Sequence, residues 1–161
     1  MKTVVFIITV LLNALSAGFF FAWSVSVILG TKKVGDFTYL ETMQNINREI
    51  LNPMFFMVFF GSLITLVFNT ILQYNQKPVF GLVLAAAIIY LIGTFGVTVF
   101  GNVPLNDALN VTDISSLGVE ELKQFRTHYE HHWNRYHNIR TVAGLISFIL
   151  LILSLFIQKL Y

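Results

Sequence analysis

Charged side chains are absent from four long stretches of the chain, and apolar residues dominate each of them. The stretches cover residues 3–31, 50–76, 78–106 and 141–158, and their lengths are 29, 27, 29 and 18 residues. A helix needs about 20 mostly apolar residues to cross the hydrocarbon core of a bilayer, and about 17 in the shortest cases. The pattern therefore predicts four membrane-spanning helices, at about 4–29, 54–72, 79–100 and 142–157.

The segments that connect these spans differ in length. Only about six residues, 73–78, separate the second span from the third, which predicts a tight antiparallel hairpin. The other two connections, 30–53 and 101–140, are long, and in a four-span protein they lie on the same side of the membrane. They contain all eight acidic residues and all four histidines.

In both long connections the apolar residues have the spacing that is typical of helices. Apolar residues recur every three or four positions over 36–52, which predicts an amphipathic helix with Asp36 as its N-cap. This helix should end at Asn52, because a residue before proline resists the α conformation, and Pro53 is suited to begin the second span. From Val119 onward the spacing predicts one continuous helix of roughly 39 residues that includes the fourth span.

Small residues recur at intervals of four in the first span, at Ala14, Gly18, Ala22 and Ser26. Such a row lets a neighbouring helix approach closely, which is how helices associate in lipid. Gly93 in the third span and Ala143 in the fourth are further packing signals. We expect these residues to form helix contacts and assign them no chemistry.

The composition agrees with this pattern, since 56% of the residues are hydrophobic and 11% are charged, against about 25% charged in soluble domains. We therefore expect one all-α integral membrane domain over residues 1–161, a four-helix transmembrane bundle with two partly helical connections on one side. The absence of cysteine excludes disulfides, iron–sulfur clusters and cysteine-ligated zinc. The cations of the chain are dispersed, so we expect no nucleic acid as a partner. The expected partner is the lipid bilayer. The oligomeric state is open.

The segment 128–140 contains the strongest candidates for a functional site, because it places His, Trp, Asn and Arg at the membrane boundary. Trp133, His137 and Arg140 follow the spacing i, i+4 and i+7, so they project to one side of a helix, with Asn134 beside them. One interpretation is a site at the mouth of the bundle. The other is interfacial anchoring, since Trp and Arg are common at membrane boundaries.

Asparagines in both long connections could supply amide groups to such a site. Asn102 and Asn106 flank Pro104, which indicates either a capped helix end with a turn or a loop folded into the bundle mouth. Asn47 and Asn52 could contribute from the other connection, and Asn52 is also suited to cap a helix.

The spacing of His128, His131 and His132 would let two imidazoles bind one metal ion. The chain has no HExxH motif, and a solvated polar helix face explains the same cluster. Bis-histidine haem needs ligands on facing helices, whereas every histidine lies in one connection. We expect no metal and no other cofactor.

Four motifs resemble those of the anthrone oxygenase-like membrane proteins, a family of small four-span proteins. They are GFFFAWS (18–24), MQxINxxILNPxFF (43–56), FGNVPLN (100–106) and WNRYHNIRT (133–141). The resemblance covers nearly the whole chain. It implies a four-helix membrane bundle and cofactor-free oxygenation of an electron-rich, lipophilic polycyclic phenol or quinol-like compound.

The resemblance also implies roles for particular residues. Such a reaction needs a base, donors for a developing oxyanion and an apolar aromatic slot. His137 would be the base and Arg140 its charge partner; the donors would be Asn102, Asn106 and Asn134, and the slot Phe20, Trp23, Phe56 and Trp133. The alternative is a non-catalytic membrane protein that binds a lipid, a quinone or a partner protein at the same mouth.

The short segments contain Lys2, Lys77 and Lys159 and no acidic residue. Because positive charge in short segments marks the cytoplasmic side, we expect both termini in the cytoplasm of a cell-membrane protein. The total of seven cations on the long side points the other way.

Cysteine labelling tests this orientation, because the natural chain has no cysteine to interfere. In intact cells a membrane-impermeant thiol reagent should label Glu120→Cys and leave Gln76→Cys unlabelled until the cells are permeabilised. The reverse pattern would place both termini outside.

Overall fold

The computed structural model describes residues 2–158, and helices make up almost all of this part of the chain. The α-helices are α1 (Lys2–Ala22), α2 (Ile28–Thr31), α3 (Asp36–Glu49), α4 (Pro53–Leu72), α5 (Lys77–Ile89), α6 (Val103–Val111) and α7 (Val119–Gln158). Three π-helical segments, η1 (Trp23–Val27), η2 (Tyr90–Gly96) and η3 (Thr98–Asn102), and one 3₁₀ turn, η4 (Ile114–Ser116), complete it. No strand occurs within the described range, which confirms the all-α class.

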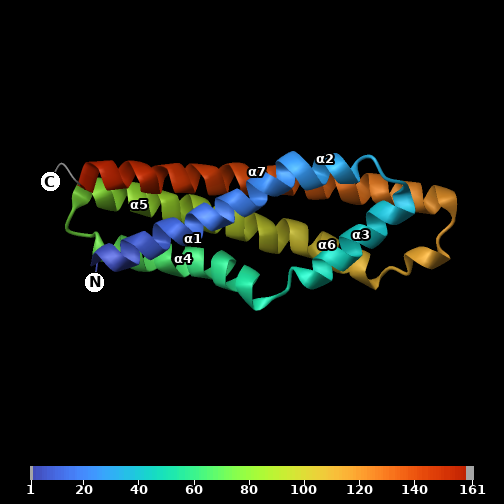
Figure 1. Cartoon of the computed structure of the whole chain (residues 1–161), viewed down its shortest axis with the longest axis horizontal. Helices are drawn as coiled ribbons and strands as arrows, with labels where there is room; N and C mark the ends of the chain where they lie inside the picture. The colour runs from blue at the N-terminus through green and yellow to red at the C-terminus, as the bar shows by residue number, and fades with distance from the viewer. Residues whose placement is uncertain (1, 159–161) are drawn as a thin grey trace.

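Four helical stretches are long and apolar enough to cross a membrane: Lys2–Thr31, Pro53–Leu72, Lys77–Val111 and Val119–Ile157. They form an elongated bundle in which α7 runs the whole length (Figure 1). The beginning of α1, the end of α7 and the α4–α5 turn lie at one end of the bundle, and α2, α3 and α6 lie toward the other. The predicted tight hairpin and the shared side of the two long connections are therefore confirmed.

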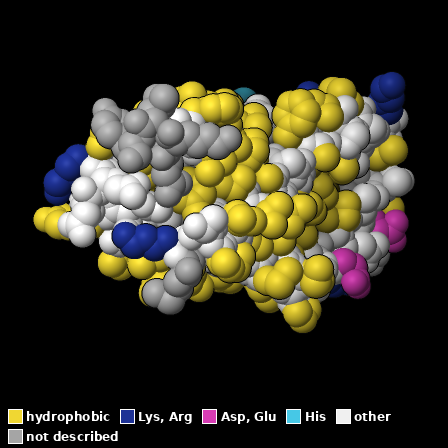
Figure 2. Space-filling model, turned by 60° about the vertical axis from the view of Figure 1, so that its left-hand side comes forward, with side chains coloured by type: hydrophobic (Ala, Val, Ile, Leu, Met, Phe, Trp, Pro, Cys, Tyr) yellow, Lys and Arg dark blue, Asp and Glu magenta, His cyan; other side chains and the backbone are white. Residues whose placement is uncertain are grey.

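The surface fits a bilayer environment. Figure 2 shows a band of hydrophobic side chains around the middle of the molecule, with acidic side chains only toward one end of the face in view. Large apolar residues such as Ile64, Val67, Ile92 and Phe156 are exposed along the spans. A soluble monomer rarely exposes so continuous an apolar surface, so the chain is an integral membrane protein.

Close helix contacts occur at two of the predicted small residues. A Cβ atom added to Gly93 would lie 2.5 Å from the Cβ atom of Ala143, so η2 and α7 approach to backbone distance there. The row in α1 was interpreted wrongly as a packing face. Gly18, Ala22 and Ser26 are exposed, and no atom lies within 4 Å of a Cβ built on Gly18. The buried face of α1 instead carries Phe6, Thr9, Asn13, Ser16, Ala17 and Phe20.

Two further expectations about the connections need correction. Gly35, not Asp36, is the N-cap of α3, because Asp36 is the first helical residue and pairs with a distant arginine. The helix stops at Glu49, three residues before Asn52, whose side chain caps α4 by accepting from the Phe55 amide at 3.0 Å. Pro53 begins α4 as predicted.

The segment around Pro104 is neither a turn nor a loop. The third span continues through η2 and η3 into α6, so the helix extends to Val111 instead of ending near Phe100. Pro104 is the second residue of α6, which directly follows the π-helical segment η3. This extension carries Asn102 and Asn106 on helical backbone.

Replacing Gly93 by Ala should lower the unfolding temperature of the detergent-solubilised protein, because the new methyl group collides with Ala143. Overpacking of this kind costs about 1 to 3 kcal/mol. Gly81→Ala is the matched control, since a Cβ at Gly81 meets no atom within 4 Å. Equal melting of the two variants would show that η2 and α7 are not in close contact.

Candidate functional site

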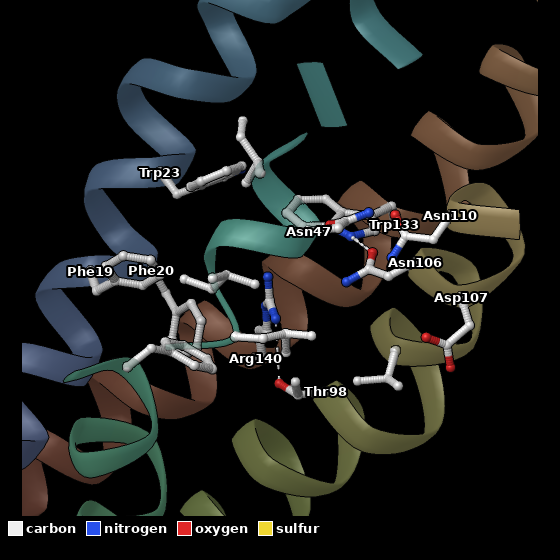
Figure 3. A pocket seen from close by; sticks show the side chains of 15 residues that line it. Phe19, Phe20, Trp23, Asn47, Thr98, Asn106, Asp107, Asn110, Trp133 and Arg140 are labelled. Carbon is white, nitrogen blue, oxygen red and sulfur yellow. Dashed lines mark hydrogen bonds between the residues drawn. The ribbon is translucent and has the colours of Figure 1, made fainter. Parts of the chain in front are cut away.

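A cavity of about 100 Å³ lies where α3 and α6 cover the bundle. Figure 3 shows Phe19, Phe20 and Trp23 on one side of it, Asn106, Asp107 and Asn110 on the other, and Arg140 between them. Its walls are mostly apolar and aromatic. The lining residues are Phe19, Phe20, Trp23, Ile46, Asn47, Ile50, Leu51, Phe55, Thr98, Val103, Asn106, Asp107, Asn110, Trp133 and Arg140.

Arg140 is the cation of this pocket, and only 7% of its surface is exposed. Its Nε and Nη2 atoms donate to Nδ1 of His137 at 3.2 and 3.0 Å, and Nη1 donates to Oγ1 of Thr98 at 3.4 Å. A guanidinium group has five N–H donors, so two have no partner among the described residues. Both ion pairs found in residues 2–158 belong to Arg126. Arg140 is therefore a buried cation without a carboxylate partner in that range.

Aromatic rings partly compensate the buried charge. The guanidinium carbon of Arg140 lies 4.6 Å from the ring centre of Phe20 and 5.1 Å from that of Trp133. The negative face of an aromatic ring attracts a cation, most strongly where water is excluded. This arrangement keeps Arg140 charged and directs its remaining donors toward the cavity.

His137 lies behind Arg140 and is fully buried. Its Nδ1 faces two N–H groups of Arg140 and must accept, while Nε2 lies 3.2 Å from the carbonyl oxygen of Phe20 and must donate. The hydroxyl of Ser24, 2.9 Å from Nε2, is a second partner. The hydrogen bonds thus assign the neutral imidazole with its proton on Nε2. His137 orients Arg140 and does not line the cavity.

Trp133 and Asn106 form the opposite wall. The indole ring of Trp133 stacks on His137 with 5.1 Å between ring centres and 7° between planes. Its Nε1 donates to Oδ1 of Asn106 at 2.8 Å, and the hydroxyl of Tyr129 donates to the same oxygen at 3.1 Å. Asn47 donates to Tyr129 at 3.4 Å. These bonds connect α3, α6 and α7 at the pocket.

The remaining predicted residues lie outside this cavity. Asn102 is buried one layer behind it and donates to the carbonyl oxygen of Trp133 at 3.1 Å. Asn52 lines a neighbouring apolar groove, where it caps α4. Asn134 faces a separate polar groove on the outside of α7. Of the predicted ligand-binding residues, the structure brings together Trp23, Asn47, Asn106 and Trp133, with Arg140.

Sequence reasoning missed several pocket residues: Phe19, Phe55, Thr98, Asp107 and Asn110. Val103, Asn106, Asp107 and Asn110 follow the helical spacing i, i+3, i+4 and i+7, but Gly101 and Pro104 in the same segment indicate a helix end or a loop and mask this signal. Asn110 Oδ1 is buried without a partner among the described residues, so it offers an acceptor. Trp23 and Thr98 begin π-helical segments, and a π turn often re-aims side chains at functional sites.

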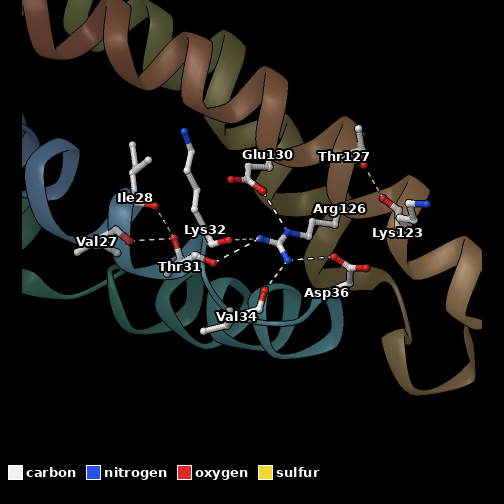
Figure 4. Close-up of polar contacts among 10 residues, drawn as sticks. All are labelled: Val27, Ile28, Thr31, Lys32, Val34, Asp36, Lys123, Arg126, Thr127 and Glu130. Carbon is white, nitrogen blue, oxygen red and sulfur yellow. Dashed lines mark hydrogen bonds and ion pairs between the residues drawn. The ribbon is translucent and has the colours of Figure 1, made fainter.

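Arg126 fastens the first connection over this region. Its Nη1 donates to Asp36 at 2.9 Å and to the Val34 carbonyl at 2.7 Å, and its Nε donates to Glu130 at 3.0 Å (Figure 4). Its guanidinium also lies 4.5 Å from the ring centre of Tyr39. Burial raises the pKa of the Tyr39 phenol well above its usual range, so this ring stays neutral. The cluster holds α3 against α7, and α3 supplies Ile46 and Asn47 to the pocket.

His128, His131 and His132 lie on the outer face of α7. His128 and His132 are neighbours, with ring centres 4.3 Å apart, and Nδ1 of His132 lies 2.8 Å from the His128 carbonyl oxygen. No group of three or more His, Asp or Glu side chains within the described part of the chain is arranged to hold a metal ion.

Asn106→Leu should destabilise the site, because it leaves the Trp133 N–H and the Tyr129 hydroxyl without their acceptor. A buried donor that loses its acceptor costs about 1 to 3 kcal/mol. Asn106→Asp keeps the acceptor oxygen for both donors, and Asn45→Leu changes an exposed asparagine of α3. Thermal unfolding followed by tryptophan fluorescence should rank Asn106→Leu lowest; unfolding at the parent temperature would mean that these bonds contribute nothing.

Comparison with known proteins agrees with the motifs noted in the sequence. No curated protein and no solved structure matches the chain significantly. The model of one family, described as anthrone oxygenase, matches residues 43–150, which include the second half of α3, all of α6 and the part of α7 that carries Trp133, His137 and Arg140. This match extends over more than half of the chain, and the protein therefore belongs to the anthrone oxygenase family.

Proposed function

We propose that the pocket binds the ionised oxygen of a lipophilic polycyclic phenol or quinol-like compound against Arg140, and that the protein oxygenates this compound without a cofactor. The observation that carries the proposal is the buried guanidinium of Arg140, which has unused donors and no acidic partner among the described residues. A buried cation is costly unless an anion pairs with it. A phenolate or enolate oxygen would be that anion.

The walls suit an aromatic ligand. Rings from Phe19, Phe20, Trp23, Phe55 and Trp133 line the cavity, and those of Phe20 and Trp133 lie against the guanidinium. Small-molecule sites are mostly apolar with a few placed polar groups, and aromatic pairs favour offset or edge-to-face packing. The unused amide group of Asn106 and the unpaired oxygen of Asn110 could fix further oxygens or hydroxyls of the ring system.

The proposed reaction converts a CH₂ group beside the phenolic ring into a carbonyl. Loss of one proton gives a carbanion, which passes one electron to O₂; the resulting radical and superoxide then combine and take up a proton to form C–OOH. Loss of water leaves C=O, so that CH₂ and O₂ give C=O and H₂O. Arg140 would stabilise the oxyanion formed in the first step, where preorganised positive charge has its largest effect.

The structure supports different roles for His137 and Asp107. The family resemblance implies His137 as the base, yet both of its nitrogens are already bonded and it does not line the cavity. We propose that His137 is a positioning residue that orients Arg140. The carboxylate of Asp107 lines the mouth of the pocket and would accept the proton.

A non-catalytic role is the second candidate, and one observation favours it. Asp107 is exposed at the mouth, and the histidine that could act as a base is sealed behind Arg140. A pocket with an anion-binding cation and no well-placed base would bind a quinone, phenol or lipid headgroup without turnover. Ligand affinity is common to both candidates, and oxygen consumption separates them.

Arg140→Gln should weaken anthrone binding by roughly tenfold to a hundredfold, as expected for loss of a charged hydrogen bond. Arg135→Gln is the matched control, because Arg135 is an exposed arginine of the same helix. Binding and anthrone-dependent oxygen uptake are measured on purified proteins of equal folded content. Equal affinity of Arg140→Gln and the parent would remove Arg140 from the site, and binding without oxygen uptake by the parent would favour the non-catalytic candidate.

The same assay separates the proposed base from the positioning residue. Asp107→Asn should lower turnover by about a hundredfold or more with affinity little changed, because a base acts mainly in the transition state. His137→Asn offers an oxygen near the Nδ1 position and should retain more affinity than His137→Ala. Loss of turnover in His137→Asn with full affinity would instead make His137 the base.

A further inference from the structure

A second cavity, of about 460 Å³, lies beside the pocket between α1 and α4. It is lined by Ala14, Leu15, Ser16, Gly18, Phe19, Phe20, Ile50, Asn52, Met54, Phe55, Val58 and Phe59. Four of these residues, Phe19, Phe20, Ile50 and Phe55, also line the pocket that contains Arg140. The two cavities therefore share one wall. We call the second cavity the α1–α4 groove.

The shared wall contains side chains that are only partly buried. Phe19 is 42% exposed, Phe55 is half-buried, and their ring centres lie 5.9 Å apart. Phe20, in contrast, is 1% exposed and packs against Arg140. A rotation of Phe19 or Phe55 about its side-chain bonds would join the groove to the pocket, with Phe20 left in place.

The groove has no unused polar group that would attract a polar occupant. The hydroxyl of Ser16 is hydrogen-bonded to Tyr90 at 2.9 Å. The side chain of Asn52 accepts from the Phe55 amide and donates to the Glu49 carbonyl oxygen at 2.7 Å. The rest of the lining is hydrocarbon or aromatic, so the occupant must be apolar.

The groove opens at membrane depth. Ala14 to Phe20 belong to the middle of the first span, and Met54 to Phe59 belong to the first turns of the second. Leu15 and Met54 at its rim are 57% and 68% exposed. Gly18 leaves the groove open, because a Cβ at this position would meet no atom within 4 Å. Two small residues of the α1 row, Ala14 and Gly18, thus line the groove.

The sizes of the two cavities indicate that each would hold a different part of one ligand. Small-molecule sites usually measure about 300 to 1,000 Å³, and the pocket at Arg140 alone is smaller than this range. It can hold the oxygen-bearing end of a molecule, while the adjoining groove has room for a flexible hydrocarbon segment.

We propose that the ligand is a membrane-resident amphiphile, a phenolic or quinol ring that carries a hydrocarbon chain. It enters sideways from the bilayer between α1 and α4 and passes Phe19 and Phe55. Its ring oxygen pairs with Arg140, and its chain lies in the α1–α4 groove. This inference rests on the proposed function, because the ring must bind at Arg140.

The test uses two probes that differ only in the chain: dihydroxynaphthalene and the same ring with a decyl chain, measured under nitrogen. Gly18→Leu should fill the groove, weaken binding of the decyl compound at least tenfold and leave the ring-only compound unchanged. Gly81→Leu is the control, since Gly81 is another exposed helical glycine with open space around it. Val58→Phe fills the groove from α4 and covers the case in which Gly18→Leu does not fold.

A photoreactive diazirine on the decyl chain locates the chain directly. In the parent protein, adducts should appear on residues 14–18 and 54–58. Excess dihydroxynaphthalene should displace them, and Arg140→Gln should lose them.

Three results would overturn the inference: adducts outside the groove, adducts that persist in Arg140→Gln because the groove holds any lipid chain, and crosslinks between two copies of the protein. Parent binding of the ring-only probe with no groove adduct would reject the chain site and leave the proposed function intact. Failure of both probes to bind the parent would reject both proposals.

Discussion

The central constraint on this protein is a guanidinium group enclosed in a bundle that lies in lipid. Removing a cation from water is expensive, and a cation in a protein interior usually has an acidic partner. Arg140 has instead an imidazole nitrogen, a hydroxyl and two aromatic faces. These groups tolerate the charge without neutralising it. A buried positive charge with unused N–H groups is thereby maintained, and His137 is held in the tautomer that accepts from it.

The helices α3 and α6 cover the end of the bundle and enclose this site. Tyr39, Leu40 and Met43 of α3 pack with Leu109, Tyr129 and Trp133 of α6 and α7 in a hydrophobic cluster. Gln44 donates to two carbonyl oxygens at the end of α6, at 2.8 and 2.9 Å. Together with Arg126 these contacts hold α3 and α6 in place, so polar pocket residues on both helices face Arg140. The contacts that stabilise this cap therefore also determine the geometry of the site.

A membrane location also explains the asymmetry of the pocket. Its polar side, with Asn106, Asp107 and Asn110, lies toward the extramembrane helices, and its aromatic side lies toward α1 and α4. A lipophilic phenol concentrates in the bilayer with its oxygen near the polar boundary. The pocket has the same polarity along the same direction, so a molecule moving sideways from the lipid needs no change of orientation to reach Arg140.

Local sequence patterns determined the secondary structure almost completely. Four uncharged apolar stretches specify four spans, Asn52 and Pro53 specify the beginning of α4, and the uninterrupted spacing after Val119 specifies α7. The same local spacing placed Trp133, His137 and Arg140 on one side of α7, and this is correct because helical geometry relates residues only a few positions apart.

Which helix faces that side is not a local property. His137 bonds the carbonyl oxygen of Phe20, 117 residues away, and the outward row of small residues in α1 was assigned to the wrong face. In lipid both faces of a span are apolar, so hydrophobicity does not distinguish the face that packs from the face that meets the bilayer. Only the tertiary structure decided that Asn106 faces the pocket while Asn134 faces outward, and that Arg140 has no acidic neighbour among the described residues.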